Sequence, residues 1–264
     1  MHRLAFALVV LWLAVPWCAA SGLAPTAELE QGATARIAEV VDGDTVVLDS
    51  GDELRLVGIQ APKLPLGRPD FTPWPLAAEA KAALEALCLG RRVTLAYGGR
   101  RSDRHGRLLA HLTRDDGVWI QGELLRRGFA RVYSFRDNRA RVADMLALER
   151  EARAAKRGIW SHPYYAVRSG DKARNVPLDS FEIVEGRVLA AAVVNGRAYL
   201  NFGDNWRTDF TASVAPRDRR AFEREGHDLL ALEGRVIRVR GWVKLRNGPM
   251  IEVTHPEQIE VLPQ

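Results

Sequence analysis

The chain has 264 residues, of which 47% are hydrophobic and 27% are charged. This balance is ordinary for a globular protein and sets the chain apart from disordered and fibrous sequences. The length predicts one large or two small domains, and the net charge of +5 is compatible with an acidic partner without establishing one.

The N-terminus has the pattern of a targeting segment. "MHRLAFALVVLWLAVPWCAAS" places Arg3 before an apolar run over residues 4–17, followed by small residues, which predicts a signal peptide over residues 1–20. The run is short for a membrane span, so an uncleaved anchor is the second interpretation. Cleavage would remove Cys18 and leave Cys88 alone, so no intramolecular disulfide is expected. We therefore expect an exported protein, periplasmic or secreted, that is not inserted in the membrane after cleavage.

Two modules are predicted in the mature chain. The first, residues 34–162, has the order strands, helix, strands, helix, helix. Its expected strands are residues 35–50, 52–59, 91–98 and 106–113, and its expected helices are residues 75–90, 118–128 and 138–158.

Residues 163–180 lack periodicity and contain Pro, Gly and Ser, so they are predicted to be a linker. The second module, residues 181–264, is expected to hold a strand pair over 181–203 that turns at Asn195-Gly196, a strand over 207–214, a helix over 216–232 and a hairpin over 234–253. This order is that of a smaller OB-like β-barrel. The predicted fold class is therefore mainly β with helices (α+β), with two barrel domains.

The stretch "VVDGDTVVL" places Asp42 and Asp44 in an otherwise apolar strand. Alternation along a strand points both carboxylates to one face, which suggests a cation or phosphate site, although a bulge or turn with solvated acids explains them equally simply. A hairpin centred on Ser50-Gly51 would pair Val46 with Arg55 and bring Arg55 within reach of Asp44. That contact fits either an ion pair or a phosphate clamp.

Five segments in order resemble the staphylococcal nuclease (thermonuclease) family: "VVDGDTVVL", "RLVGIQAP", "SDRHGRLLAH", "GVWIQGELLRRGFARV" and "RGIWS". The resemblance spans about residues 35–161. It implies an OB-type barrel with attached helices that hydrolyses DNA and RNA phosphodiesters with the help of Ca²⁺, and binds a nucleotide on the barrel face.

Carried over residue by residue, the resemblance implies a metal site and a phosphate clamp. Asp44 matches a calcium-ligand aspartate, Asp42 lies near the metal, and Thr45 stands where a backbone carbonyl completes the coordination. The phosphate clamp corresponds to Arg55 and Arg107. In addition, His105 stands where the family has a tyrosine near a phosphate.

Three positions depart from the family pattern. Gln60 replaces a second ligand aspartate, Ala61 replaces a threonine near the metal, and Lys63 replaces the glutamate held to be the general base. The exchanges at Gln60 and Lys63 make the pocket three charges more positive, which disfavours a cation and favours phosphate. A charged lysine cannot accept a proton, so Lys63 is not expected to act as the base.

Three hypotheses follow. The first is an exported protein that binds nucleic acid or phosphate groups, with weak or no calcium-dependent nuclease activity. The second is an active DNA or RNA phosphodiesterase that uses a substitute base, with His105, Asp70 and Glu79 as candidates. The third is an envelope protein-interaction module in which Arg55 and Arg107 are structural.

The second module carries a basic strand, "RVIRVRGWVKLR". Its alternation places Arg240 and Trp242 on one face with other cations, which suggests single-stranded nucleic-acid binding by ionic contacts and base stacking. A solvated strand face is the simpler interpretation. The OB pattern offers another surface instead, at Tyr199, Trp206 and Arg207.

Overall fold

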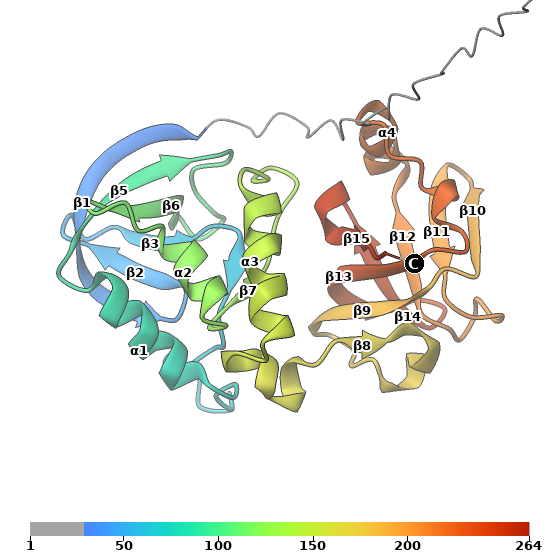
Figure 1. The fold of residues 1–264 in the computed structure, drawn as a ribbon, viewed down its shortest axis with the longest axis horizontal. Helices are drawn as coiled ribbons and strands as arrows, with labels where there is room; N and C mark the ends of the chain where they lie inside the picture. The colour runs from blue at the N-terminus through green and yellow to red at the C-terminus, as the bar shows by residue number, and fades with distance from the viewer. Residues whose placement is uncertain (1–28, 264) are drawn as a thin grey trace, which may run out of the picture.

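The computed structural model describes residues 29–263, which form two modules lying side by side (Figure 1). The predicted signal peptide at residues 1–20 lies outside these residues. Within the described part of the chain, no helix combines the length and apolar character needed to cross a membrane.

The first module is a closed five-stranded barrel with strand order β1-β2-β3-β6-β5, beside a two-stranded pair, β4 with β7. Its strands are β1 (Glu30–Asp42), β2 (Thr45–Leu48), β3 (Glu53–Leu56), β4 (Ile59–Gln60), β5 (Arg92–Tyr97), β6 (Leu108–Arg114) and β7 (Arg131–Val132). Its helices are α1 (Ala77–Cys88), α2 (Ile120–Arg126) and α3 (Val142–Ala154), followed by the 3-10 turns η1 (Gly158–Ser161) and η2 (Pro163–Tyr165).

The core of this module follows the expected periodicities. Val46 and Leu48 are buried on β2, and Ala80, Leu84 and Leu87 bury one face of α1 against the barrel at helical spacing. The long strand β1 pairs with β5 through its first half and with β2 through its second half, so one strand closes the barrel.

The β2–β3 hairpin differs by one residue from the predicted register. Thr45 lies opposite Arg55, and Val46 lies opposite Leu54 rather than Arg55. The cause is a three-residue loop over residues 49–51, ending in Gly51 with φ of 89°, where a two-residue loop was expected. The predicted proximity of Arg55 to Asp44 is nevertheless observed.

The second module is a curled eight-stranded sheet with strand order β10-β11-β12-β14-β13-β9-β8, in which β15 also pairs with β13. Its strands are β8 (Arg168–Ser169), β9 (Phe181–Arg187), β10 (Ala190–Val194), β11 (Arg197–Asn201), β12 (Thr211–Val214), β13 (Val236–Leu245), β14 (Pro249–Val253) and β15 (Ile259–Val261). Its helices are α4 (Pro216–Arg224) and the 3-10 turns η3 (Gly170–Asn175), η4 (Leu230–Leu232) and η5 (Pro256–Gln258).

The strands of this sheet are paired in the same pattern as those of the first barrel. Strands β9 and β10 are separated only by Val188 and Leu189; β9 pairs with β13 and β10 pairs with β11, as the two halves of β1 do with their neighbours. The parallel pair β12–β14 corresponds to the parallel pair β3–β6. The OB-like order predicted for the second module is therefore present, with the expected turn at Asn195-Gly196 and a similar turn at Asn247-Gly248 in the second hairpin.

The segment expected to be a linker is folded. Between residues 163 and 180, β8 pairs in parallel with the start of the second sheet, and Ala173 and Val176 are buried in its core. The hydroxyl of Tyr165 donates to Pro75 O at 2.7 Å. Residues 163–180 therefore join the modules by packing against both of them.

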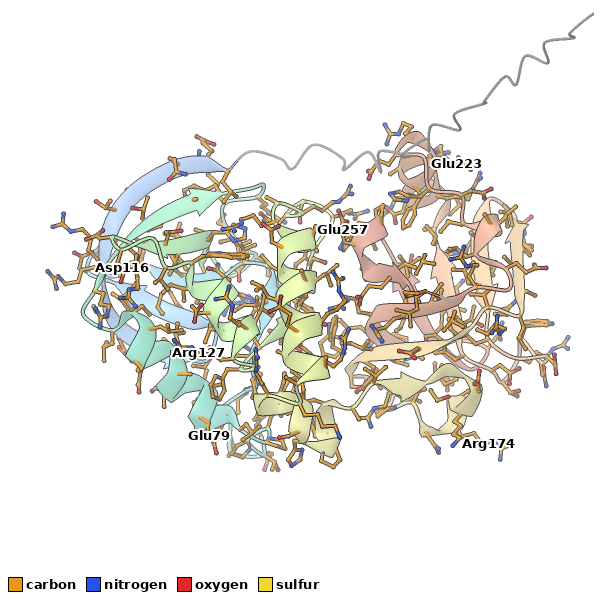
Figure 2. All side chains as sticks on the ribbon, viewed as in Figure 1. Glu79, Asp116, Arg127, Arg174, Glu223 and Glu257 are labelled. Carbon is orange, nitrogen blue, oxygen red and sulfur yellow. The ribbon has the colours of Figure 1, made fainter. Side chains whose placement is uncertain are left out.

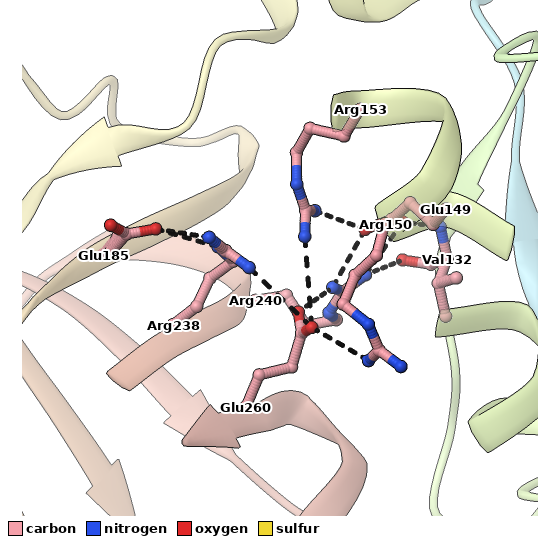
Figure 3. A network of polar contacts seen from close by, with 8 residues as sticks. All are labelled: Val132, Glu149, Arg150, Arg153, Glu185, Arg238, Arg240 and Glu260. Atoms are coloured by element: carbon pink, nitrogen blue, oxygen red, sulfur yellow. Dashed lines mark hydrogen bonds and ion pairs between the residues drawn. The ribbon is translucent and has the colours of Figure 1, made fainter. Parts of the chain in front are cut away.

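Arg240 on β13 points at α3 of the first module, not at solvent (Figure 3). Arg240 is 1% exposed and pairs with Glu149 at 3.0 Å and with Glu260 at 2.5 Å. Arg153 contacts both of these carboxylates, and Arg238 contacts that of Glu260. The interpretation of Arg240 as a nucleic-acid ligand was wrong: the sequence shows a charged strand face but not the acidic side chain that covers it.

A second ionic contact crosses the boundary near Glu257 (Figure 2). The guanidinium of Arg139, just before α3, donates to both oxygens of Glu257 at 2.9 and 3.0 Å and to Glu225 at 2.7 Å. Between the two networks, Ser134 Oγ lies 2.7 Å from His255 Nε2. Polar contacts at several points therefore fix the second module against the first.

Candidate phosphate site

The turn between β1 and β2 carries the two aspartates. Asp42 Oδ1 accepts a hydrogen bond from Asp44 N at 3.0 Å, which shapes the turn. Gly43 is required by close packing, because a Cβ there would lie 2.6 Å from the Cβ of Ala61 and 2.9 Å from that of Ala80. The aspartates are thus held against α1 and the chain after β4, in a buried turn.

Asp44 is fully buried and its carboxylate has several partners. Ala61 N donates to Oδ2 at 2.8 Å, the Thr45 hydroxyl donates to Oδ1 at 3.2 Å, and Arg55 Nη1 lies 3.6 Å from Oδ1. Burial by itself would raise the pKa of Asp44, but the charges of Arg55 and Lys63 outweigh it and hold the pKa well below its usual range. Asp44 is therefore a fixed negative charge at the base of the site.

Lys63 lies between the two aspartates. Its ammonium nitrogen is 2.6 Å from Asp44 Oδ1 and 3.1 Å from Asp42 Oδ2, and its side chain is 18% exposed. Burial and the neighbouring charge of Asp44 raise the pKa of Asp42, and the positive charge of Lys63 opposes that rise. The side chain that replaces the family's glutamate therefore serves as a counter-ion to both carboxylates.

Gln60 has its hydrogen-bond partner outside this cluster. Its Oε1 accepts two hydrogen bonds from Arg131, from Nε at 3.0 Å and from Nη2 at 2.8 Å. Arg131 is buried, and its guanidinium lies 4.8 Å from the ring centroid of Phe181 in the second module. The carbonyl oxygen of Gln60 is thus engaged by a neighbouring guanidinium.

Arg107 comes from the turn before β6. Its Nε donates to Asp103 Oδ2 at 2.8 Å, while Oδ1 of the same carboxylate accepts from the backbone N–H groups of His105 and Arg107. Gly106, with φ of 81°, completes this turn. Asp103 therefore both shapes the turn and orients the guanidinium.

The predicted phosphate-binding residues of the first module, Arg55, Arg107 and His105, share one cavity. Arg55, Arg107, His105 and Lys63 line a hollow of about 720 Å³ together with Trp242. Its wall carries six lysine and arginine side chains against two carboxylates, those of Asp103 and Asp137. This excess of positive charge suits an anionic ligand.

The structure separates the candidate bases. His105 lies in the cavity wall, whereas Asp70 and Glu79 are exposed and do not line it. Figure 2 shows Glu79 in the first turn of α1, on the outer side of the barrel. Of the three candidates, only His105 is placed near the two arginines.

The sequence-based prediction missed one contributor to the site and placed another on the wrong surface. Arg131 received no role, because nothing in the local sequence pairs β7 with β4 and hence Arg131 with Gln60. Trp242 was assigned to a separate surface of the second module, but it lies in the same cavity as Arg55 and Arg107. The sequence indicated only that Trp242 is an aromatic residue on a basic strand. Its position in the cavity depends on how the two modules pack against each other.

The fold and the cavity define a class of protein: an OB-type barrel with two arginines in the wall of a cationic hollow. Comparison with known proteins agrees with this class. Residues 53–162 match the family model described as staphylococcal nuclease homologue.

Curated relatives are similar over about half of the chain. An "Uncharacterized endonuclease" of Escherichia coli is 36% identical over 129 residues, covering 48% of this chain and 76% of that protein. The thermonuclease of Staphylococcus hyicus is 28% identical over 137 residues (49% and 76%), and endonuclease YncB of Bacillus subtilis is 31% identical over 135 residues (49% and 63%). The chain belongs to the staphylococcal nuclease homologue family, as the sequence motifs indicated.

Proposed function

We propose that this protein binds nucleic acid through its phosphate groups and has weak or no calcium-dependent nuclease activity. The observation that carries the proposal is the position of Lys63. Its ammonium contacts Asp42 and Asp44 at 3.1 and 2.6 Å, between the carboxylates that the family resemblance assigns to the metal site. The ammonium of Lys63 therefore serves as the counter-ion of the Asp42 and Asp44 carboxylates.

The donor set does not fit Ca²⁺. This ion takes six to eight oxygen ligands, but the Gln60 oxygen is bound by Arg131 and an ammonium lies between the aspartates. Within residues 29–263, no group of three or more His, Cys, Asp or Glu side chains converges as a metal site would require.

The arginine half of the site is intact. The charge of Asp44 holds the pKa of Arg55 above its usual range despite burial, so Arg55 is always charged, and Arg107 is oriented by Asp103. Guanidinium groups match phosphate oxygens, and each charge-assisted hydrogen bond contributes roughly 1.5–3 kcal/mol. In this proposal the two arginines hold a phosphodiester or terminal phosphate in the cavity without metal.

The test is calorimetric titration of the purified chain with a nucleoside 3′,5′-bisphosphate, with calcium and with a chelator. We expect equal affinity under both conditions and at least tenfold weaker binding by Arg107→Ala. Arg217→Ala, which removes an exposed arginine outside the cavity, is the control and should not change the affinity. Absence of binding, or equal affinities of the natural chain and Arg107→Ala, would reject the proposal and favour a protein-interaction role.

A second candidate function is an active nuclease with a substitute base. The observation in its favour is that His105 lines the cavity two residues before Arg107. Its Nε2 accepts a hydrogen bond from Arg104 Nε at 3.0 Å, so that nitrogen is engaged. A DNA-gel activity assay with calcium, magnesium or chelator separates the two candidates: cleavage lost in His105→Gln would support the second.

We also propose that the protein is exported to the periplasm or secreted. The support for this proposal is the sequence of residues 1–20 alone. Fractionation of cells, with N-terminal sequencing of the mature chain, tests it. Recovery of an uncleaved chain in the membrane fraction would favour the anchored form instead.

A further inference from the structure

The second module contributes directly to the wall of the phosphate cavity. Trp242 of β13 is 43% exposed and lines the same hollow as Arg55 and Arg107. Its indole Nε1 donates to the Tyr133 hydroxyl at 2.8 Å, which fixes the ring against the first module. An exposed tryptophan held in one orientation beside a phosphate clamp is a suitable stacking surface for a base.

The hollow continues beyond this tryptophan. A second cavity of about 440 Å³ shares Tyr133, Phe135 and Trp242 with the first and extends along β13 to Lys244 and Arg246. The two cavities therefore meet at these three aromatic side chains, and together they form a groove that starts at the arginines of the first module and ends on the second.

The far end of the groove has cations that a ligand could reach. Lys244 pairs with Asp179 at 2.6 Å, but both side chains are largely exposed, so this surface pair is weak and exchangeable. Arg246 is exposed and has no ion pair among residues 29–263. The one carboxylate in this wall, that of Glu252, lies 3.5 Å from Arg197.

We infer that the second module extends the phosphate site into a groove for single-stranded nucleic acid. One phosphate lies at Arg55 and Arg107, a neighbouring unpaired base stacks on Trp242, and a further phosphate lies at Lys244 and Arg246. The inference rests on the proposed function, because it needs the arginine clamp as its starting point. Single strands are favoured over duplexes because only unpaired bases expose their faces to a ring.

The test compares short and long ligands on the full chain, because a separated second module would expose Arg240. We expect Trp242→Ala to weaken binding of a labelled eight-nucleotide deoxythymidine strand about fivefold or more, and to weaken binding of the nucleoside bisphosphate by a smaller factor than binding of the strand. Arg107→Ala should weaken both. Trp206→Ala removes a comparably exposed tryptophan outside both cavities, and should change neither.

A salt series tests the distal phosphate. Lys244→Gln with Arg246→Gln should reduce the dependence of oligonucleotide affinity on salt, because fewer counterions are released on binding. If Trp242→Ala binds the oligonucleotide normally while Arg107→Ala does not, the groove is wrong and the proposed function stands. If Trp206→Ala is the variant that loses affinity, the strand lies on the other surface; if neither ligand binds the natural chain, both proposals fail.

Discussion

The ammonium of Lys63 lies 2.6 Å from Oδ1 of Asp44, a carboxylate with no exposed surface. A buried carboxylate requires a positive partner. Here the partner is covalently part of the chain, so the turn that carries Asp42 and Asp44 has a counter-ion that is not a bound metal.

Replacing Lys63 should therefore destabilise the protein. In Lys63→Met, Asp42 and Asp44 would repel each other with only Arg55 nearby. We expect the free energy of unfolding to fall by about 2–4 kcal/mol, measured by urea denaturation. Lys81→Met removes a surface lysine 3.9 Å from Glu85 and should cost less than about 1 kcal/mol; similar losses in both variants would show that Lys63 is not a structural counter-ion.

Calcium binding should appear when acids are restored. Gln60→Asp with Lys63→Glu provides two additional carboxylates next to Asp42 and Asp44, so calcium should raise the melting temperature of the double variant and not that of the natural chain. Gln60→Asp alone is the control, because Lys63 remains between Asp42 and Asp44 in that variant. A calcium-induced rise in the natural chain would contradict the assignment of Lys63 as the cation of this site.

The pair Glu149–Arg240 should dominate the stability of the interface. Arg240→Met leaves Glu149 buried with only Arg153 as a charged partner, and we expect a loss of about 3–5 kcal/mol. Arg150→Met, which removes an exposed arginine 3.5 Å from Glu260, should cost less than about 1 kcal/mol. Denaturation followed by tryptophan fluorescence and by circular dichroism would measure both, and equal losses would refute a special role for Arg240.

Acid should weaken the structure through two histidines. Burial lowers the pKa of His255 and of His111 to about 4 in the folded protein. Because an unfolded histidine binds a proton near pH 6.5, the unfolded state gains protons first, and stability falls as the pH drops from about 6.5 to 4, by about 3 kcal/mol for each.

The comparison of variants isolates this contribution from that of the carboxylates. His255→Gln should flatten the decline of unfolding free energy between pH 6.5 and 4, whereas the exposed His227→Gln should leave the natural slope. An unchanged slope in His255→Gln would mean that His255 does not titrate in this window.

Local patterns in the sequence predicted much of the fold. Asp42, Arg55 and Arg107 occur in ordered motifs, and the structure places Arg55 and Arg107 in one cavity. The predicted hairpin register was wrong by one residue, because the length of the loop depends on the backbone conformation of Gly51. A glycine permits the positive φ that is observed there but does not require it. The mature boundary of the chain stays a prediction.

The contacts between distant segments could not be predicted in this way. The alternation of polar and apolar residues correctly separated Arg240 from the core face of β13. However, a side chain that faces solvent and one that faces a neighbouring module give the same sequence pattern. Likewise, the charge of Lys63 indicated a poor general base, and its contacts with both aspartates depended on how the chain after β4 folds over the turn.

The carboxylate of Glu149 has a consequence for hydrogen exchange. It accepts the Val132 amide at 2.6 Å on β7 and also binds the Arg240 guanidinium on β13. The Val132 amide can exchange with solvent only when its hydrogen bond to the Glu149 carboxylate breaks. Movement of that carboxylate also removes a counter-ion from the buried Arg240 of the second module. Amides of β7 and β13 should therefore share one opening free energy, so that the two modules, although each has its own hydrophobic core, form a single cooperative unit at their boundary.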